Sequence, residues 1–207
     1  MRKQQREAIL ALLEETYMGT ETALNYSTPF ELLVAVIMSA QCTDERVNKI
    51  TARIFPKYNT PEKMGALSQE QLEEEIRDCG LFRSKAKNLL ATCKMLTEEY
   101  NSVIPDTVEE LMKLPGVGKK TANVVASIVY KVPAIAVDTH VFRVSHRLGL
   151  AKGDDPLAVE KELQKAIPKN KWSDAHHWLI WHGRKICKAR NPLCSECVLV
   201  ELCPYKE

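Results

Sequence analysis

The 207-residue sequence has no apolar stretch that approaches the roughly 18 residues needed by a membrane-spanning helix. Glycine is scarce, at 8 residues, and proline, at 10, is no more than ordinary, which excludes a collagen-like or low-complexity chain. The N-terminal segment lacks a small-residue cleavage site after its short apolar stretch, so it predicts an amphipathic helix and no signal peptide. These absences favour a globular protein of the cytoplasm without a membrane partner.

Strand signals are nearly absent, because only residues 132–137 (VPAIAV) resemble a strand, and one strand cannot form a sheet. Helix signals are frequent. Thr28-Pro29-Phe30-Glu31 is typical of a capping box with proline at the first helical position, and the apolar run after it predicts a buried helix over 29–40. Further helices are expected around Ile9 and Leu13 and near 44–56, 61–65, 69–78, 84–100, 107–112, 118–130, 139–148, 156–166 and 173–187. The sequence therefore predicts an all-α protein.

The net charge is only +2, from 29 basic and 27 acidic residues, which does not by itself indicate a polyanionic partner. The charges are unevenly distributed. Residues 113–152 contain seven lysines and arginines against one acid, whereas residues 97–110 contain five acids and no base. This distribution favours one electropositive face. Charges scattered over solvated helices would explain it about equally well.

Disulfide bonds are not expected, because the cytosol keeps thiols reduced. Four of the seven cysteines nevertheless crowd together near the C-terminus, with six, two and five residues between them: Cys187, Cys194, Cys197 and Cys203. Four thiolates so close in sequence can hold one compact metal centre. Structural zinc usually uses two separated cysteine pairs, and a [4Fe–4S] cluster also takes four thiolates. The spacing predicts a metal site and favours iron–sulfur only slightly over zinc.

Two cations lie in the six-residue loop between the first two of these cysteines, namely Lys188 and Arg190. A loop held at both ends by a metal would present them rigidly, as contacts with a DNA backbone require. Three histidines lie on one predicted helix near the cluster, and for them we expect packing and satisfied hydrogen bonds: His176, His177 and His182.

The segment 114–120 (LPGVGKK) connects a short predicted helix with a long apolar one. Gly116 and Gly118 let the backbone turn sharply and present N–H groups at a helix N-terminus, which suits a phosphate. Nucleotide-binding motifs do not fit, because Lys113 and Thr121 stand where those motifs require glycine. The segment predicts a helix–turn–helix hairpin that clamps a phosphodiester, or a plain turn whose glycines serve geometry alone.

Lys120 falls in the first turn of the helix after this hairpin, where a cation is disfavoured. A lysine kept partly neutral is a nucleophile of the Schiff-base type. Asp138 ends the apolar run 132–137 and precedes the next predicted helix. Aspartate in that position is usually an N-cap, and the alternative is a carboxylate that moves a proton or stabilises positive charge near the lysine.

Together, LPGVGKKTANVV at 114–125, AVDTHVFRVSHRLGL at 136–150 and the cysteine spacing resemble the endonuclease III family. That family comprises helix-hairpin-helix, iron–sulfur DNA glycosylases with lyase activity. Further matching segments are 26–33, SAQCTD at 39–44 and CGLFRSKAKN at 79–88. The resemblance implies that Lys120 is the nucleophile, that Asp138 is the catalytic aspartate, and that the four clustered cysteines hold a [4Fe–4S] cluster.

The resemblance also implies residues that contact DNA. Gln41 matches the residue that enters the gap left by a flipped nucleotide, and Leu81 matches the wedge between bases of the opposite strand. The hairpin residues that would hold the phosphate backbone, partly through a bound monovalent cation, are Leu114, Gly116, Val117 and Gly118. The implied partner is double-stranded DNA containing damaged pyrimidines or abasic sites. We expect a monomer associated with the nucleoid.

The implied fold has two helical domains with the DNA cleft between them. Residues 22–132 would form a six-helix barrel that contains the hairpin. Residues 1–21 and 133–207 would form a discontinuous domain that carries the iron–sulfur cluster.

Two rival functions stay open at this point. The adenine-mismatch glycosylases of the same superfamily are monofunctional, lack lysine at the position of Lys120 and carry an added C-terminal domain, whereas this chain has Lys120 and ends four residues after Cys203. The second rival is a non-catalytic DNA-binding or redox-sensing protein that keeps the hairpin and the cluster. The presence of both Lys120 and Asp138 favours a bifunctional enzyme over either.

Overall fold

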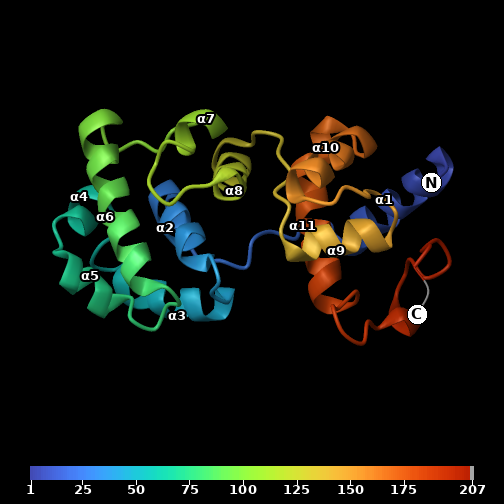
Figure 1. Cartoon of the computed structure of the whole chain (residues 1–207), viewed down its shortest axis with the longest axis horizontal. Coiled ribbons are helices and arrows are strands. Elements are labelled where there is room, and N and C mark those ends of the chain that lie inside the picture. The colour runs from blue at the N-terminus through green and yellow to red at the C-terminus, as the bar shows by residue number, and fades with distance from the viewer. Residues whose placement is uncertain (206–207) are drawn as a thin grey trace. The chain divides into compact units, whose positions relative to one another are not determined.

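The computed structural model describes residues 1–205 (Figure 1). Within this part of the chain there are eleven α-helices and two short 3-10 helices, and no β-strand, which confirms the predicted all-α class. Residues 132–137 are an extended connection between helices. No helix in residues 1–205 is both long enough and apolar enough to cross a membrane.

The contacts divide the chain into two compact units. One unit is Ala23–Tyr130, and the other combines Met1–Thr22 with Lys131–Glu207. These bounds differ by one and two residues from the expected segment 22–132. Each unit has its own core and is described by itself.

Unit 23–130 is built around a helix that is buried on nearly all sides. Its helices are α2 (Pro29–Ser39), α3 (Asp44–Ile54), α4 (Pro61–Gly65), α5 (Gln69–Glu75), α6 (Phe82–Glu99), α7 (Val108–Leu111) and α8 (Lys119–Tyr130). Every residue of α2 from Phe30 to Met38 is buried, as its continuous apolar run predicts. Figure 1 shows α2 between α6 and α8, and it contacts both of them.

The start of α2 differs in one detail from the predicted capping box. The Thr28 hydroxyl accepts a hydrogen bond from the backbone N–H of Glu31, as expected. The Glu31 carboxylate accepts from the N–H of Ser27 at 2.6 Å, one residue before the N-cap. The complete reciprocal box occurs instead in α5, between Ser68 and Gln71.

The discontinuous unit is centred on its last long helix. It contains α1 (Lys3–Tyr17), α9 (Thr139–Arg147), α10 (Pro156–Ala166), η1 (Lys169–Lys171), α11 (Trp172–Lys185) and η2 (Cys194–Glu196). Helix α11 packs against both α1 and α9 (Figure 1). The core includes fully buried side chains from each of these helices, among them Leu13, Val144 and Leu179, and Leu199 joins the C-terminal loop to it.

Candidate functional site

The segment between α7 and α8 forms a tight hairpin supported by α6. The N–H of Val117 donates to the carbonyl of Leu114 at 3.1 Å and closes the turn. The hydroxyl of Thr92 on α6 donates to the carbonyl of Pro115 at 2.8 Å. The side chains of Leu114 and Val117 are buried. These two residues therefore anchor the hairpin, and only their backbone is available for the expected contact with DNA.

The local structure requires glycine at only one of the two glycine positions of the hairpin. Gly116 has φ +78°, and a Cβ added there would lie 2.8 Å from the side chain of Asn88. Both the left-handed conformation and the close approach therefore require glycine at 116. An added Cβ at Gly118 would meet nothing within 4 Å. Both glycines are exposed, so this face of the turn can be approached by a ligand.

Lys120 is exposed in the first turn of α8, directly after the hairpin. Asp138 is the N-cap of α9, and its Oδ1 accepts from the N–H of Val141 at 2.7 Å. The capping interpretation of Asp138 is therefore correct, and its carboxylate stays partly exposed. Lys120 and Asp138 belong to different units.

Gln41 and Leu81 both have a left-handed backbone, with φ 54° and 58°. A non-glycine residue in this region costs about 1–2 kcal/mol and is typical of functional loops. The Leu81 side chain is 57% exposed, although it is large and apolar. A Cβ added to Gly80 would lie 3.0 Å from the carbonyl oxygen of Gln41, so the two loops are close neighbours.

A buried lysine that none of the sequence motifs includes lies beside these loops. Lys85, in the first turns of α6, is only 4% exposed and donates its hydrogen bonds to both loops. A signal was present in the sequence, because Lys85 lies four residues before Leu89 and seven before Thr92. This helical spacing places Lys85 on the buried face of α6.

The four clustered cysteines line one cavity of about 380 Å³ in the discontinuous unit. All four are free and partly buried. In the described residues 1–205, no three ligand-type side chains converge on a single point in the way that one metal ion requires. The four thiols share the wall of this cavity, and four cysteine thiolates are the donor set that a [4Fe–4S] cluster takes.

The donors around these sulfur atoms also fit a cluster. The N–H of Leu199 donates to Sγ of Cys197 at 3.4 Å, and Nη1 of Arg147 lies 3.5 Å from Sγ of Cys187. Hydrogen bonds of this kind stabilise cluster thiolates. Burial raises the pKa of the Cys197 and Cys203 thiols, so iron binding must displace their protons.

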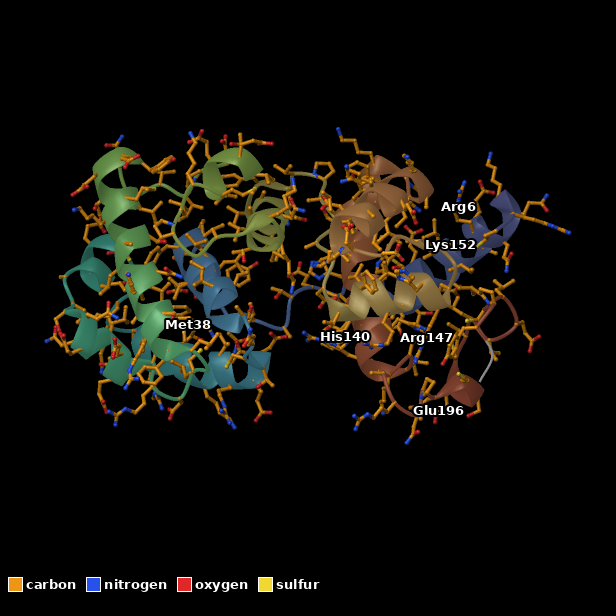
Figure 2. The ribbon with its side chains drawn as sticks, viewed as in Figure 1. Arg6, Met38, His140, Arg147, Lys152 and Glu196 are labelled. Atoms are coloured by element: carbon orange, nitrogen blue, oxygen red, sulfur yellow. The ribbon has the colours of Figure 1, made fainter. Side chains whose placement is uncertain are left out.

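The loop that carries Lys188 and Arg190 is held by two arginines of α9. Arg147 donates to the carbonyls of Lys188 and Ala189 at 2.7 and 3.2 Å, and Arg143 donates to the carbonyl of Cys187 at 3.1 Å. Figure 2 labels Arg147 beside this loop. Lys188 and Arg190 themselves are exposed. Two of the seven cations in segment 113–152 therefore hold the fold, and an electropositive face stays a prediction.

Both ring nitrogens of the buried His182 make polar contacts. Its Nδ1 lies 3.0 Å from the hydroxyl of Tyr17, and its Nε2 lies 3.7 Å from Sγ of Cys197. Burial lowers its pKa to about 4. His182 thus links α1 to a cysteine of the candidate cluster, which the spacing of histidines alone did not reveal.

The hairpin and the cysteine loop both match known family models. The model of the HhH-GPD superfamily base excision DNA repair protein matches residues 34–169. The model of the iron–sulfur binding domain of endonuclease III matches residues 187–203, which decides between iron–sulfur and zinc. The class that the fold and site define is therefore that of helix-hairpin-helix proteins of base excision DNA repair.

Similar proteins narrow this class. Endonuclease III of Rickettsia prowazekii is 50% identical over 99% of this chain and 97% of its own length. Endonuclease III of Escherichia coli K12 is 47% identical over 100% and 98%. A solved structure of a trapped endonuclease III–DNA covalent intermediate has a TM-score of 0.94 at 51% identity, covering 99% of this chain and 96% of that chain. This chain belongs to the endonuclease III family, and the predicted resemblance is confirmed.

Proposed function

We propose that this chain is a bifunctional DNA glycosylase that removes oxidised pyrimidines from double-stranded DNA and cleaves the strand at abasic sites. The observation that carries the proposal is the exposed Lys120, which lies two residues after Gly118 and the open glycine face of the hairpin. Such an arrangement brings a nucleophile next to a bound phosphate backbone. A 51% identical relative has been trapped as a covalent intermediate with DNA, which supports a covalent step.

In the first step the damaged nucleotide must leave the duplex, because its sugar carbon cannot be reached within the stack. The unprotonated Nζ of Lys120 forms a bond with C1′. The bond between C1′ and the base breaks, and the base leaves with the electron pair and takes up a proton. Asp138 would accept the proton that Lys120 loses, or stabilise positive charge at the sugar. The sugar ring opens, and the product is an imine between Lys120 and C1′.

The second step cuts the strand. The imine draws electrons from C1′ and thereby acidifies the proton on C2′. As that proton is lost, its electron pair forms a double bond between C2′ and C3′, and the bond between C3′ and its oxygen breaks, so the 3′ phosphate leaves with that bond's electron pair. Water then hydrolyses the imine and restores the amine of Lys120.

DNA would be held by the hairpin and by three further loops. The exposed Gln41 and Leu81 would fill the gap and separate bases, and backbone amides of the hairpin would hold phosphates, with a monovalent cation in the bound state. Lys188 and Arg190 would contact the DNA backbone. A [4Fe–4S] cluster bound to Cys187, Cys194, Cys197 and Cys203 would serve as the rigid anchor of that loop. The site of action would be the cytosol and nucleoid, and the active species a monomer.

Borohydride trapping tests this function. With abasic DNA and borohydride, the native protein should form a covalent complex, because the imine is reduced. Without borohydride it should incise the strand. Lys120→Gln should abolish trapping but retain DNA binding. Its matched control is Lys119→Gln, because Lys119 is exposed on the same helical turn and should leave trapping intact. Trapping that survives in Lys120→Gln would overturn the assignment, and binding without incision in the native protein would indicate a non-catalytic DNA-binding protein.

A further inference from the structure

Lys85 is a buried cation that holds two loops at once. Its ammonium group donates to the carbonyl of Met38 at 2.8 Å, to the carbonyl of Ala40 at 2.6 Å and to Sγ of Cys79 at 3.2 Å. An ammonium has three N–H donors, so these contacts use all of them. The side chain is only 4% exposed, and a solvent-facing role is therefore excluded.

The acceptors are the residues that precede the two proposed DNA-contacting side chains. Met38, labelled in Figure 2, and Ala40 lie at the C-terminal end of α2, where carbonyls have no helical partner and the helix dipole is negative. The next residue is Gln41. On the other side, Cys79 precedes Gly80 and Leu81. The ammonium group of Lys85 thus connects two backbone carbonyls that precede Gln41 with the side chain of Cys79, two residues before Leu81.

Both loops need such support, because both are strained and they lie against each other. Gln41 and Leu81 have left-handed backbones, and Leu81 starts α6 without a side-chain cap. A Cβ at position 80 would lie 3.0 Å from the carbonyl oxygen of Gln41, close enough that the carbonyl would have to shift by a few tenths of an ångström. Conformations of this kind persist only when surrounding contacts fix them.

We propose that Lys85 is a positioning residue for the repair reaction: it holds the loops of Gln41 and Leu81 in the geometry that inserts both side chains into duplex DNA. This inference rests on the proposed function of those two residues. Lys85 does not itself contact DNA. Its contribution is confined to substrates that must be unstacked, because a single-stranded abasic site needs neither a wedge nor a gap-filling side chain.

The test compares Lys85→Met with Lys87→Met on two substrates. Methionine keeps most of the length of lysine and removes the donors, and Lys87 is an exposed lysine two residues further along α6. For Lys85→Met we expect incision of duplex abasic DNA to fall on the order of 10- to 100-fold, the scale of a misplacement near 1 Å. Single-turnover incision of single-stranded abasic DNA should stay within about twofold, and Lys87→Met should match the native protein on both.

Two further measurements separate positioning from a general loss of structure. A 2-aminopurine base opposite the lesion should brighten when the native protein unstacks it, and this signal should be lost in Lys85→Met. On a Leu81→Ala background, Lys85→Met should add a smaller loss than it causes in the native protein, because the part that acts through Leu81 is already gone and only the part through Gln41 remains. Equal losses on both substrates, or full additivity with Leu81→Ala, would overturn the proposal.

Gly80→Ala keeps the inference testable if Lys85→Met does not fold. Gly80 is exposed, and its new Cβ would press on the carbonyl of Gln41 from outside the buried site. We expect the same duplex-specific loss, and unchanged duplex incision would contradict the proposal. Failure of the proposed function is distinguishable, because the native protein would then neither incise single-stranded abasic DNA nor be trapped on it.

Discussion

The phenol hydroxyl of Tyr17 lies 3.0 Å from Nδ1 of His182, in the buried junction between α1 and α11. Because burial lowers the pKa of His182 to about 4, the ring is neutral at pH 7 and has one N–H. If the hydroxyl donates to Nδ1, the ring proton lies on Nε2, which faces Sγ of Cys197 at 3.7 Å. In that tautomer, Tyr17 orients the Nε2–H of His182 toward a cysteine of the cluster.

Tyr17→Phe should destabilise the discontinuous unit. Without the hydroxyl, the buried Nδ1 of His182 loses its partner, which costs about 1–3 kcal/mol. For a chain of this length that corresponds to about 2–4 °C in Tm for each kcal/mol. Thermal unfolding of the cluster-loaded protein measures this change. Circular dichroism reports the loss of helix, and the visible absorbance reports the loss of the cluster.

The matched control for this change is Tyr58→Phe. The Tyr58 hydroxyl makes a longer bond, 3.4 Å to Glu75, in unit 23–130. Its loss should shift Tm by less than that of Tyr17→Phe and should not affect cluster absorbance. Equal effects of the two substitutions would show that the link from Tyr17 to His182 contributes nothing specific.

Arg147→Lys should release the loop between Cys187 and Cys194. Arginine donates from two nitrogens to the carbonyls of Lys188 and Ala189, and a lysine ammonium cannot reproduce that fork. We expect fewer irons per chain after gel filtration and weaker binding to a non-cleavable abasic duplex.

Arg190→Ala separates loop support from DNA contact. Its side chain is exposed and lies within the same loop, so iron content should stay at the native value while DNA affinity falls. If Arg147→Lys retained full iron content and affinity, the cluster and Arg143 would suffice to hold the loop without Arg147.

Residues whose role depends on local pattern could be predicted from the sequence. The apolar run after Thr28 gave the buried helix α2, and the interval between Cys187 and Cys203 gave the metal site. Of the two roles that the sequence leaves open for Asp138, the N-cap is confirmed, because capping involves only residues three positions apart.

Roles that depend on contacts between distant segments could not be predicted in this way. Lys85 acts on carbonyls 45 and 47 residues away, and Tyr17 meets His182 across 165 residues. Helical spacing could place Lys85 and His182 on buried faces, but it could not name their partners. Nor could it show that Leu114 and Val117 turn their side chains into the core, whereas Gly116 and Gly118 stay exposed.

Alanine substitution should affect stability differently at the two hairpin glycines. Gly116→Ala should lower stability by about 1–3 kcal/mol, because φ +78° is strained for alanine and the new Cβ meets Asn88. Gly118→Ala should change stability by less than about 0.5 kcal/mol, since an added Cβ there has open space. DNA affinity should nevertheless fall in Gly118→Ala if that face approaches a phosphate. Urea unfolding and fluorescence anisotropy with a labelled duplex measure the two quantities, and a Gly118→Ala protein with native affinity would remove Gly118 from the interface.

Asp138→Asn separates the structural role of this residue from its proposed chemical role. Asparagine caps helices about as well as aspartate, so the bond from the N–H of Val141 should survive and Tm should change little. A residue that serves only as a cap would therefore leave turnover unchanged. Loss of a group that accepts a proton or stabilises positive charge should lower turnover by about 10²-fold or more. Asp155→Asn is the control, because Asp155 caps α10 with its side chain and has no proposed part in the reaction. For both variants we would measure Tm and the single-turnover rates of base release and strand incision. Native rates in Asp138→Asn would show that Asp138 serves only as a cap.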